Sequence, residues 1–89
     1  MAFKTKDLSV LAYANGFTLW HYVTGDLAAD ADTAGYFNAA SDMLRVGDMI
    51  MANLDADGTP QAGILLVASN SGGTVDVANL TQVGASNGD

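Results

Sequence analysis

The chain of 89 residues contains no cysteine, no glutamate and a single proline, and only three of its residues are Lys or Arg. Without cysteine it forms neither a disulfide nor a thiolate zinc site. All ten acidic residues are aspartate, which favours turns and helix caps over helix interiors. The formal net charge of −7 argues against nucleic acid and against anionic membrane surfaces as partners, because both are bound through clustered Lys and Arg.

Long hydrophobic runs are also missing, since no apolar stretch approaches the roughly 20 residues of a membrane span. Residues 1–7 contain two lysines and lead into an alternating pattern, so we do not interpret them as a signal peptide. We expect one domain, residues 1–89, with an N-terminal arm at 1–7 and a loose tail at 84–89. Such a short chain buries little surface, and self-association is a common source of additional burial.

Alternating apolar residues and turn signals predict a mainly β fold. Asn15-Gly16 is a strong two-residue hairpin signal between two strand-like runs. The run 62–68 is apolar throughout, so we expect it to be buried on both faces. The pattern predicts a small antiparallel β barrel or sandwich of five to six short strands. The expected strands are 8–14, 17–24, 49–54, 62–68 and 74–77, with the apolar signal continuing at Leu80 and Val83 and with turns at 55–60 and 70–73.

One short helix is expected over residues 33–44, where apolar side chains recur at helical spacing. Asp32 or Thr33 supplies a side chain that caps a helix start. Gly35 weakens the helix by about 1 kcal/mol relative to Ala, so irregular turns are the alternative. The apolar positions are Tyr36, Phe37, Ala40, Met43 and Leu44.

The strand at 17–24 carries large apolar groups on both faces. Trp20 and Tyr22 lie on one face, and Phe17 and Leu19 lie on the other. We therefore expect one face to contact the core and the other a neighbouring subunit. A sugar-stacking platform of aromatic side chains is the alternative.

Catalytic and metal-binding patterns are weak. His21 is the only histidine and has no nucleophile near it in the sequence, so a half-buried histidine that hydrogen-bonds a neighbour is the simpler interpretation. Asn53, Asp55 and Asp57 match the first half of a calcium loop, but Ile64 stands where that loop needs a glutamate. We expect no enzyme activity, no cofactor and no metal. Asp26, Asp30 and Asp32 are interpreted as solvated loop charges and a helix cap.

Arg45 is the lone arginine, and two roles are open for it. The first is a structural ion pair with Asp42 or Asp48, and the second is a contact with a partner. The side chains that we expect at a partner interface are Phe3, Trp20, Tyr22, Tyr36 and Arg45.

Four segments resemble small virion proteins that tailed bacteriophages and prophages encode near their capsid genes. The likeness covers nearly the whole chain and suggests a complete protein. It carries no catalytic motif, so no functional residue is transferred. The segments are Ala12–Tyr22, Asp32–Phe37, Leu44–Asp48 and Val75–Thr81.

The resemblance implies a structural role on the capsid surface, as a decoration (cement) or head-fibre protein made in the host bacterial cytoplasm. The implied partner is the major capsid protein or another virion protein. A homo-oligomer is expected, with a trimer favoured. The alternatives are a tail or fibre component and a small carbohydrate-binding adhesion module.

Overall fold

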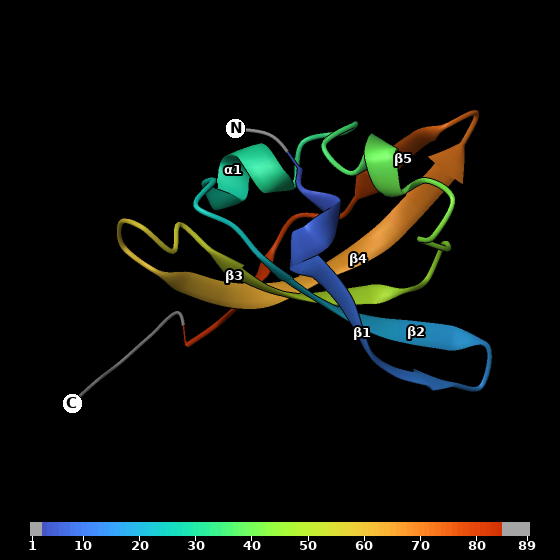
Figure 1. The fold of residues 1–89 in the computed structure, drawn as a ribbon, viewed down its shortest axis with the longest axis horizontal. Coiled ribbons are helices and arrows are strands. Elements are labelled where there is room, and N and C mark those ends of the chain that lie inside the picture. The colour runs from blue at the N-terminus through green and yellow to red at the C-terminus, as the bar shows by residue number, and fades with distance from the viewer. Residues whose placement is uncertain (1–2, 85–89) are drawn as a thin grey trace.

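The computed structural model describes residues 3–84 and shows a twisted sheet with helical turns and loops packed on one side of it (Figure 1). The six strands form one mixed sheet that does not close into a barrel, so the fold is mainly β and sandwich-like, as the sequence predicts. The elements are η1 (Thr5–Asp7), β1 (Leu8–Ala14), β2 (Phe17–Val23), α1 (Ala28–Ala31), η2 (Asn38–Ala40), β3 (Met49–Leu54), β4 (Gln61–Ser71), β5 (Thr74–Val77) and β6 (Thr81–Val83).

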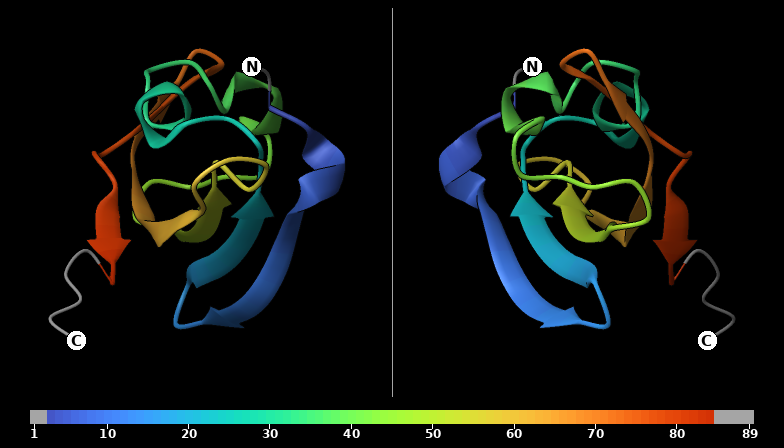
Figure 2. Two further views of the ribbon diagram at one scale, coloured as in Figure 1. Left: turned by 90° about the vertical axis from the view of Figure 1, so that its left-hand side faces the viewer. Right: turned by 90° about the vertical axis from the view of Figure 1, so that its right-hand side faces the viewer.

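The strand order is β1-β2-β3-β4-β5, and β6 pairs with the first half of β4. All pairs are antiparallel except β2 with β3. Two parallel neighbours need a crossover connection, and residues 24–48 provide it. That crossover lies over one face of the sheet (Figure 2). No second crossover among the described residues covers the opposite face.

The turn between β1 and β2 forms where the sequence predicts it. Asn15 and Gly16 both have positive φ, 55° and 84°, as a two-residue hairpin turn requires. Val10 pairs with Trp20 and Ala12 with Leu19, which leaves Leu11 as the extra residue of a β-bulge. Beyond the body of the molecule, this hairpin continues as a projecting arm (Figure 2).

The helix expected over 33–44 is wrong in position. The α-helix is α1, which is over before Thr33, and Asp32 lies at its C-terminal end instead of capping a start. Residues 33–44 form irregular turns around η2, as the alternative interpretation proposed. Gly35 has φ +92°, a conformation outside a right-handed helix, and its amide donates to the Val75 carbonyl at 2.9 Å.

The core lies between the crossover and the inner face of the sheet. β3 alternates regularly between exposed and buried residues, with Ile50 and Leu54 pointing inward. β4 does the same, which corrects the expectation that residues 62–68 are buried on both faces: Leu66 is 44% exposed. The buried hydrophobic residues are Leu8, Trp20, Tyr22, Ala31, Phe37, Ala40, Leu44, Ile50, Ala52, Leu54, Leu65, Val67, Val75 and Val77.

Asp48 is buried at the end of the crossover and attaches it to β2. Its Oδ1 accepts from the Thr18 amide at 3.0 Å, and its Oδ2 accepts from Trp20 Nε1 and the Arg45 amide, both at 3.1 Å. A second attachment comes from the Asn70 amide group, which donates to two carbonyls of the crossover. Buried polar atoms cost free energy unless they are paired, and every such side-chain atom in the described part is paired.

The N-terminal arm packs on the body from Phe3 onward. The Phe3 ring stacks on Tyr22 at 5.2 Å between ring centroids, and the Lys4 amide donates to the Tyr22 hydroxyl at 3.2 Å. Residues 1–2 of the predicted arm and residues 85–89 of the predicted tail lie outside the described residues.

Candidate interaction surface

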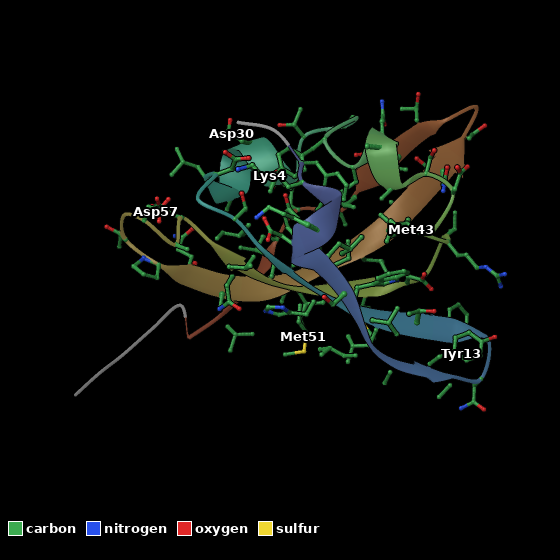
Figure 3. The ribbon with its side chains drawn as sticks, viewed as in Figure 1. Lys4, Tyr13, Asp30, Met43, Met51 and Asp57 are labelled. Atoms are coloured by element: carbon green, nitrogen blue, oxygen red, sulfur yellow. The ribbon has the colours of Figure 1, made fainter. Side chains whose placement is uncertain are left out.

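The outer face of the sheet is apolar and lies open to solvent. Its centre is formed by Met49, Met51 and Leu66, which are 46%, 43% and 44% exposed. Figure 3 shows Met51 pointing away from the sheet on the side opposite the crossover. This surface contains no Asp, Glu, Lys or Arg. We define the open face as Leu19, His21, Val23, Met49, Met51, Asn53, Ala62, Ile64, Leu66, Thr81 and Val83.

The open face is comparable in area to the largest apolar patch of a typical monomeric protein, and such patches are often functional. Strand spacing of about 4.8 Å and a rise of about 3.3 Å per residue give β2, β3, β4 and β6 together an area on the order of 400 Å². Contiguous apolar patches of more than a few hundred Å² mark interaction sites. The surface is also uneven, with a hollow of about 350 Å³ over β3 and β4. Met49, Ile64, Leu66, Ala78, Asn79 and Thr81 line this hollow.

The β1–β2 hairpin extends this apolar surface. Phe17 is 56% exposed and lies beside Met49 on the outer side of the sheet. On the inner side of the hairpin, Tyr13, at 64%, and Val10, at 56%, are also exposed, because the crossover does not reach the far part of the hairpin. Figure 3 shows Tyr13 near the tip of the β1–β2 hairpin.

Two of the expected interface residues are corrected by the structure. Trp20 and Tyr22 point to the inner face of β2 and are 7% and 0% exposed, so neither offers a surface to a partner. Trp20 and Tyr22 are therefore not available for stacking on a sugar, whereas Tyr13 is exposed. The strand is two-sided as expected, but its solvent side is the one with Phe17 and Leu19.

Phe3 and Tyr36, two further expected interface residues, are half-buried in an aromatic cluster. Phe37 is its buried centre, with ring centroids 5.3 Å from Phe3, 5.4 Å from Tyr22 and 5.0 Å from Tyr36. Edge-to-face pairs at such distances stabilise a core beyond simple burial. The cluster therefore holds the N-terminal arm and the crossover together.

Tyr36 also connects the cluster to a carboxylate. Its hydroxyl donates to Asp26 Oδ2 at 2.6 Å and lies 3.0 Å from the Tyr22 hydroxyl. The hydrogen bond from Tyr36 lowers the pKa of Asp26, against an opposing effect of burial. Burial raises the pKa of Tyr36, and the bond to the Asp26 carboxylate raises it further. The hydrogen bond from the neutral Tyr36 phenol to the charged Asp26 carboxylate therefore stabilises the fold.

Arg45, the last expected interface residue, is exposed, and its backbone amide contacts Asp48. Within residues 3–84 its guanidinium makes no ion pair, so the expected pair with Asp42 or Asp48 is wrong. A contact of Arg45 with a partner stays a prediction.

His21 behaves as the simpler interpretation predicts. It is half-buried on the open face, and its Nε2 lies 2.8 Å from Asn53 Oδ1 on the neighbouring strand. The pairing bridges two parallel strands and occupies the amide oxygen of Asn53.

The calcium candidate Asn53, Asp55 and Asp57 does not form a ligand set. Asn53 faces His21, while Asp55 has φ 51° and accepts through Oδ2 from the Thr59 amide at 3.2 Å. These contacts are typical of an Asp that shapes its own turn. Across residues 3–84 no group of three or more His, Cys, Asp or Glu side chains is placed to hold a metal ion. The same holds for the Asp26, Asp30 and Asp32 set.

Sequence reasoning missed the strongest surface feature, which is formed by aliphatic residues and methionines. The available signal was the alternation of Met49 and Met51 with Ile50 in β3, together with the absence of any charge between Met49 and Leu54. Such a strand is apolar on both faces, and the crossover covers only one of these faces.

In the described part, no helix is long and apolar enough to cross a membrane. Comparison of the chain with protein-family models, curated proteins and solved structures gives no significant match.

Proposed function

We propose that this chain is a non-enzymatic structural protein of a bacteriophage virion, which attaches to the capsid surface and stabilises or decorates the shell. The observation that carries the proposal is the open face. An uncharged apolar surface on one side of a sheet fits a flat contact with another protein.

The proposed partner is the major capsid protein or another virion protein, and its identity comes from the resemblance of four segments to short virion proteins. The charge distribution suits such a docking. The charge of −7 lies outside the open face, where it keeps the chain soluble at high copy number. The open face itself presents no charge that would have to be desolvated on contact.

The chemistry of the described residues favours attachment over catalysis. A catalytic site needs a nucleophile or base that converges with other polar groups in a pocket. Here His21 pairs with an amide, and the buried Asp48 accepts three hydrogen bonds from neutral donors. Both arrangements fix the fold.

Mass spectrometry of purified particles tests the proposal. Particles are produced from the phage or prophage whose genome encodes the chain, and the chain is quantified relative to the major capsid protein. We expect a fixed copy number per particle and lower thermal stability of particles from a strain that lacks the gene. A chain that is abundant in the lysate and absent from washed particles would overturn the proposal.

A further inference from the structure

The edge formed by β1 is free along its length. In the described part of the sheet, β1 pairs only with β2, so its other side presents unpaired backbone N–H and C=O groups. Every residue from Ser9 to Ala14 is exposed. Such an edge is a template for pairing with another strand.

This edge has little of the protection that edge strands usually carry. Leu8–Ala14 contains no charged residue and no proline, and the bulge at Leu11 is its one protective feature. The opposite edge of the sheet is different. β5 and β6 are four and three residues long, and β5 carries Asp76. Short strands and charges prevent pairing there.

The aspartates avoid the hairpin. All ten lie outside the stretch from Leu8 to Gly25, although the hairpin makes up a fifth of the chain and is largely exposed. Two copies of a chain with a net charge of −7 repel each other at most approaches. At this edge no acidic side chain would face another.

We propose that two copies of this chain pair through their β1 edges, antiparallel, about a two-fold axis. Val10 and Tyr13 are exposed on one face of the strand, and Leu11 is exposed at the bulge. With the two-fold axis between them, antiparallel pairing sets Val10 of one copy near Tyr13 of the other, and cross-strand aromatic and β-branched pairs stabilise a sheet. The contact is isologous and closes at two copies.

The pairing has a consequence for the open face, which rests on the proposed function. The two-fold axis that sets neighbouring strands antiparallel in one sheet is perpendicular to that sheet, so both open faces point the same way. One copy offers on the order of 400 Å². A standard protein interface takes about 800 Å² from each partner. Two paired copies therefore reach the area that one copy lacks.

The pairing is an alternative to the trimer that the sequence analysis favours. A three-fold ring needs head-to-tail contacts between two different surfaces. The free edge, by contrast, matches itself, which favours two copies.

Light scattering after size exclusion tests the pairing on the isolated protein at several concentrations. We expect twice the chain mass of 9.1 kDa for the unmodified protein. Val10→Lys and Tyr13→Lys are two single variants. Each substitution occurs in both copies and so places a cation on each side of the two-fold axis, and each variant is expected to have the mass of one chain. Val46→Lys is the matched control: Val46 is 57% exposed against 56% for Val10, and it lies outside β1. It should keep the double mass.

Cross-linking provides a second readout that does not depend on the lysine variants folding well. The chain has no cysteine, so Ala12→Cys and the exposed control Ala39→Cys each introduce one thiol. A short bismaleimide should link Ala12→Cys into dimers and leave Ala39→Cys largely unlinked.

A chain-mass species for the unmodified protein at every concentration, a three-copy mass, or equal behaviour of Val10→Lys and Val46→Lys would overturn the pairing. These measurements need no capsid. A monomer in light scattering and cross-linking would refute the pairing and leave the proposed attachment to particles standing. Absence of the chain from purified particles would refute the attachment and leave the pairing standing.

Discussion

Replacement of Asp48 removes three hydrogen bonds that attach the crossover to β2. Asp48→Ala leaves the Trp20 indole N–H and two backbone amides without their acceptor in a site where Asp48 is 1% exposed. An unsatisfied buried donor costs about 1–3 kcal/mol. With one fully buried and two partly buried donors, we expect a loss of about 3–5 kcal/mol in the free energy of unfolding.

Asp48→Asn gives a graded comparison. The amide keeps one oxygen, which can take the place of Oδ2 and accept from Trp20 and Arg45. Its NH₂ then faces the Thr18 amide, and two donors oppose each other. We expect a loss of about 1–2 kcal/mol, from one missing hydrogen bond. The order of stability should be Asp48, then Asn, then Ala.

Urea unfolding followed by fluorescence measures both changes, because Trp20 is the sole tryptophan and contacts Asp48 directly. A domain of this size has a total stability of about 4–13 kcal/mol, so Asp48→Ala should remove a large share of it. Asp42→Ala is the matched control, since Asp42 is exposed and should change stability by less than about 0.5 kcal/mol. If Asp48→Ala costs less than about 1 kcal/mol, the carboxylate does not attach the crossover as described.

Two further changes test the aromatic cluster and the attachment of β6. Since the hydrogen bond from Tyr36 lowers the pKa of Asp26, it contributes stability that is present at neutral pH and lost as pH falls through that pKa. Tyr36→Phe should therefore destabilise the protein more at pH 7 than in acid by urea unfolding, whereas exposed Tyr13→Phe should not; equal losses at both pH values would refute the linkage. Gly63→Ala places a Cβ 2.5 Å from the Thr81 carbonyl oxygen, so we expect a loss of about 1–3 kcal/mol and faster amide exchange in β6, and unchanged exchange would contradict that contact.

The sequence predicts most strands well because their signals are local. β1, β3 and β5 begin and end at the predicted residues, and the hairpin turn follows from Asn15 and Gly16, which tolerate positive φ. The parallel pairing of β2 with β3 was not predicted. Strand order depends on how the crossover packs, and no local pattern specifies that.

The candidate site was harder to predict because burial is a tertiary property. Trp20 and Met51 both stand in apolar strands, and only the crossover decides that the face with Trp20 is covered while the face with Met51 is open. The prediction selected aromatic side chains for the interface, and the aromatic cluster instead fills the core. The helix was misplaced because Gly35 left two outcomes open, and the structure forms irregular turns there.

The central claim is that the open face attaches the chain to the virion, and a pair of methionine variants tests it most directly. Met51→Lys introduces a charge on the open face, and Met43→Lys introduces the same charge on the crossover side, at 43% and 38% exposure (Figure 3). Each variant is expressed in a strain that lacks the gene, and its copy number in purified particles is measured by mass spectrometry. The account predicts a loss of at least about tenfold for Met51→Lys, since a buried unpaired charge costs several kcal/mol, and no loss for Met43→Lys. Equal incorporation of both variants would contradict it.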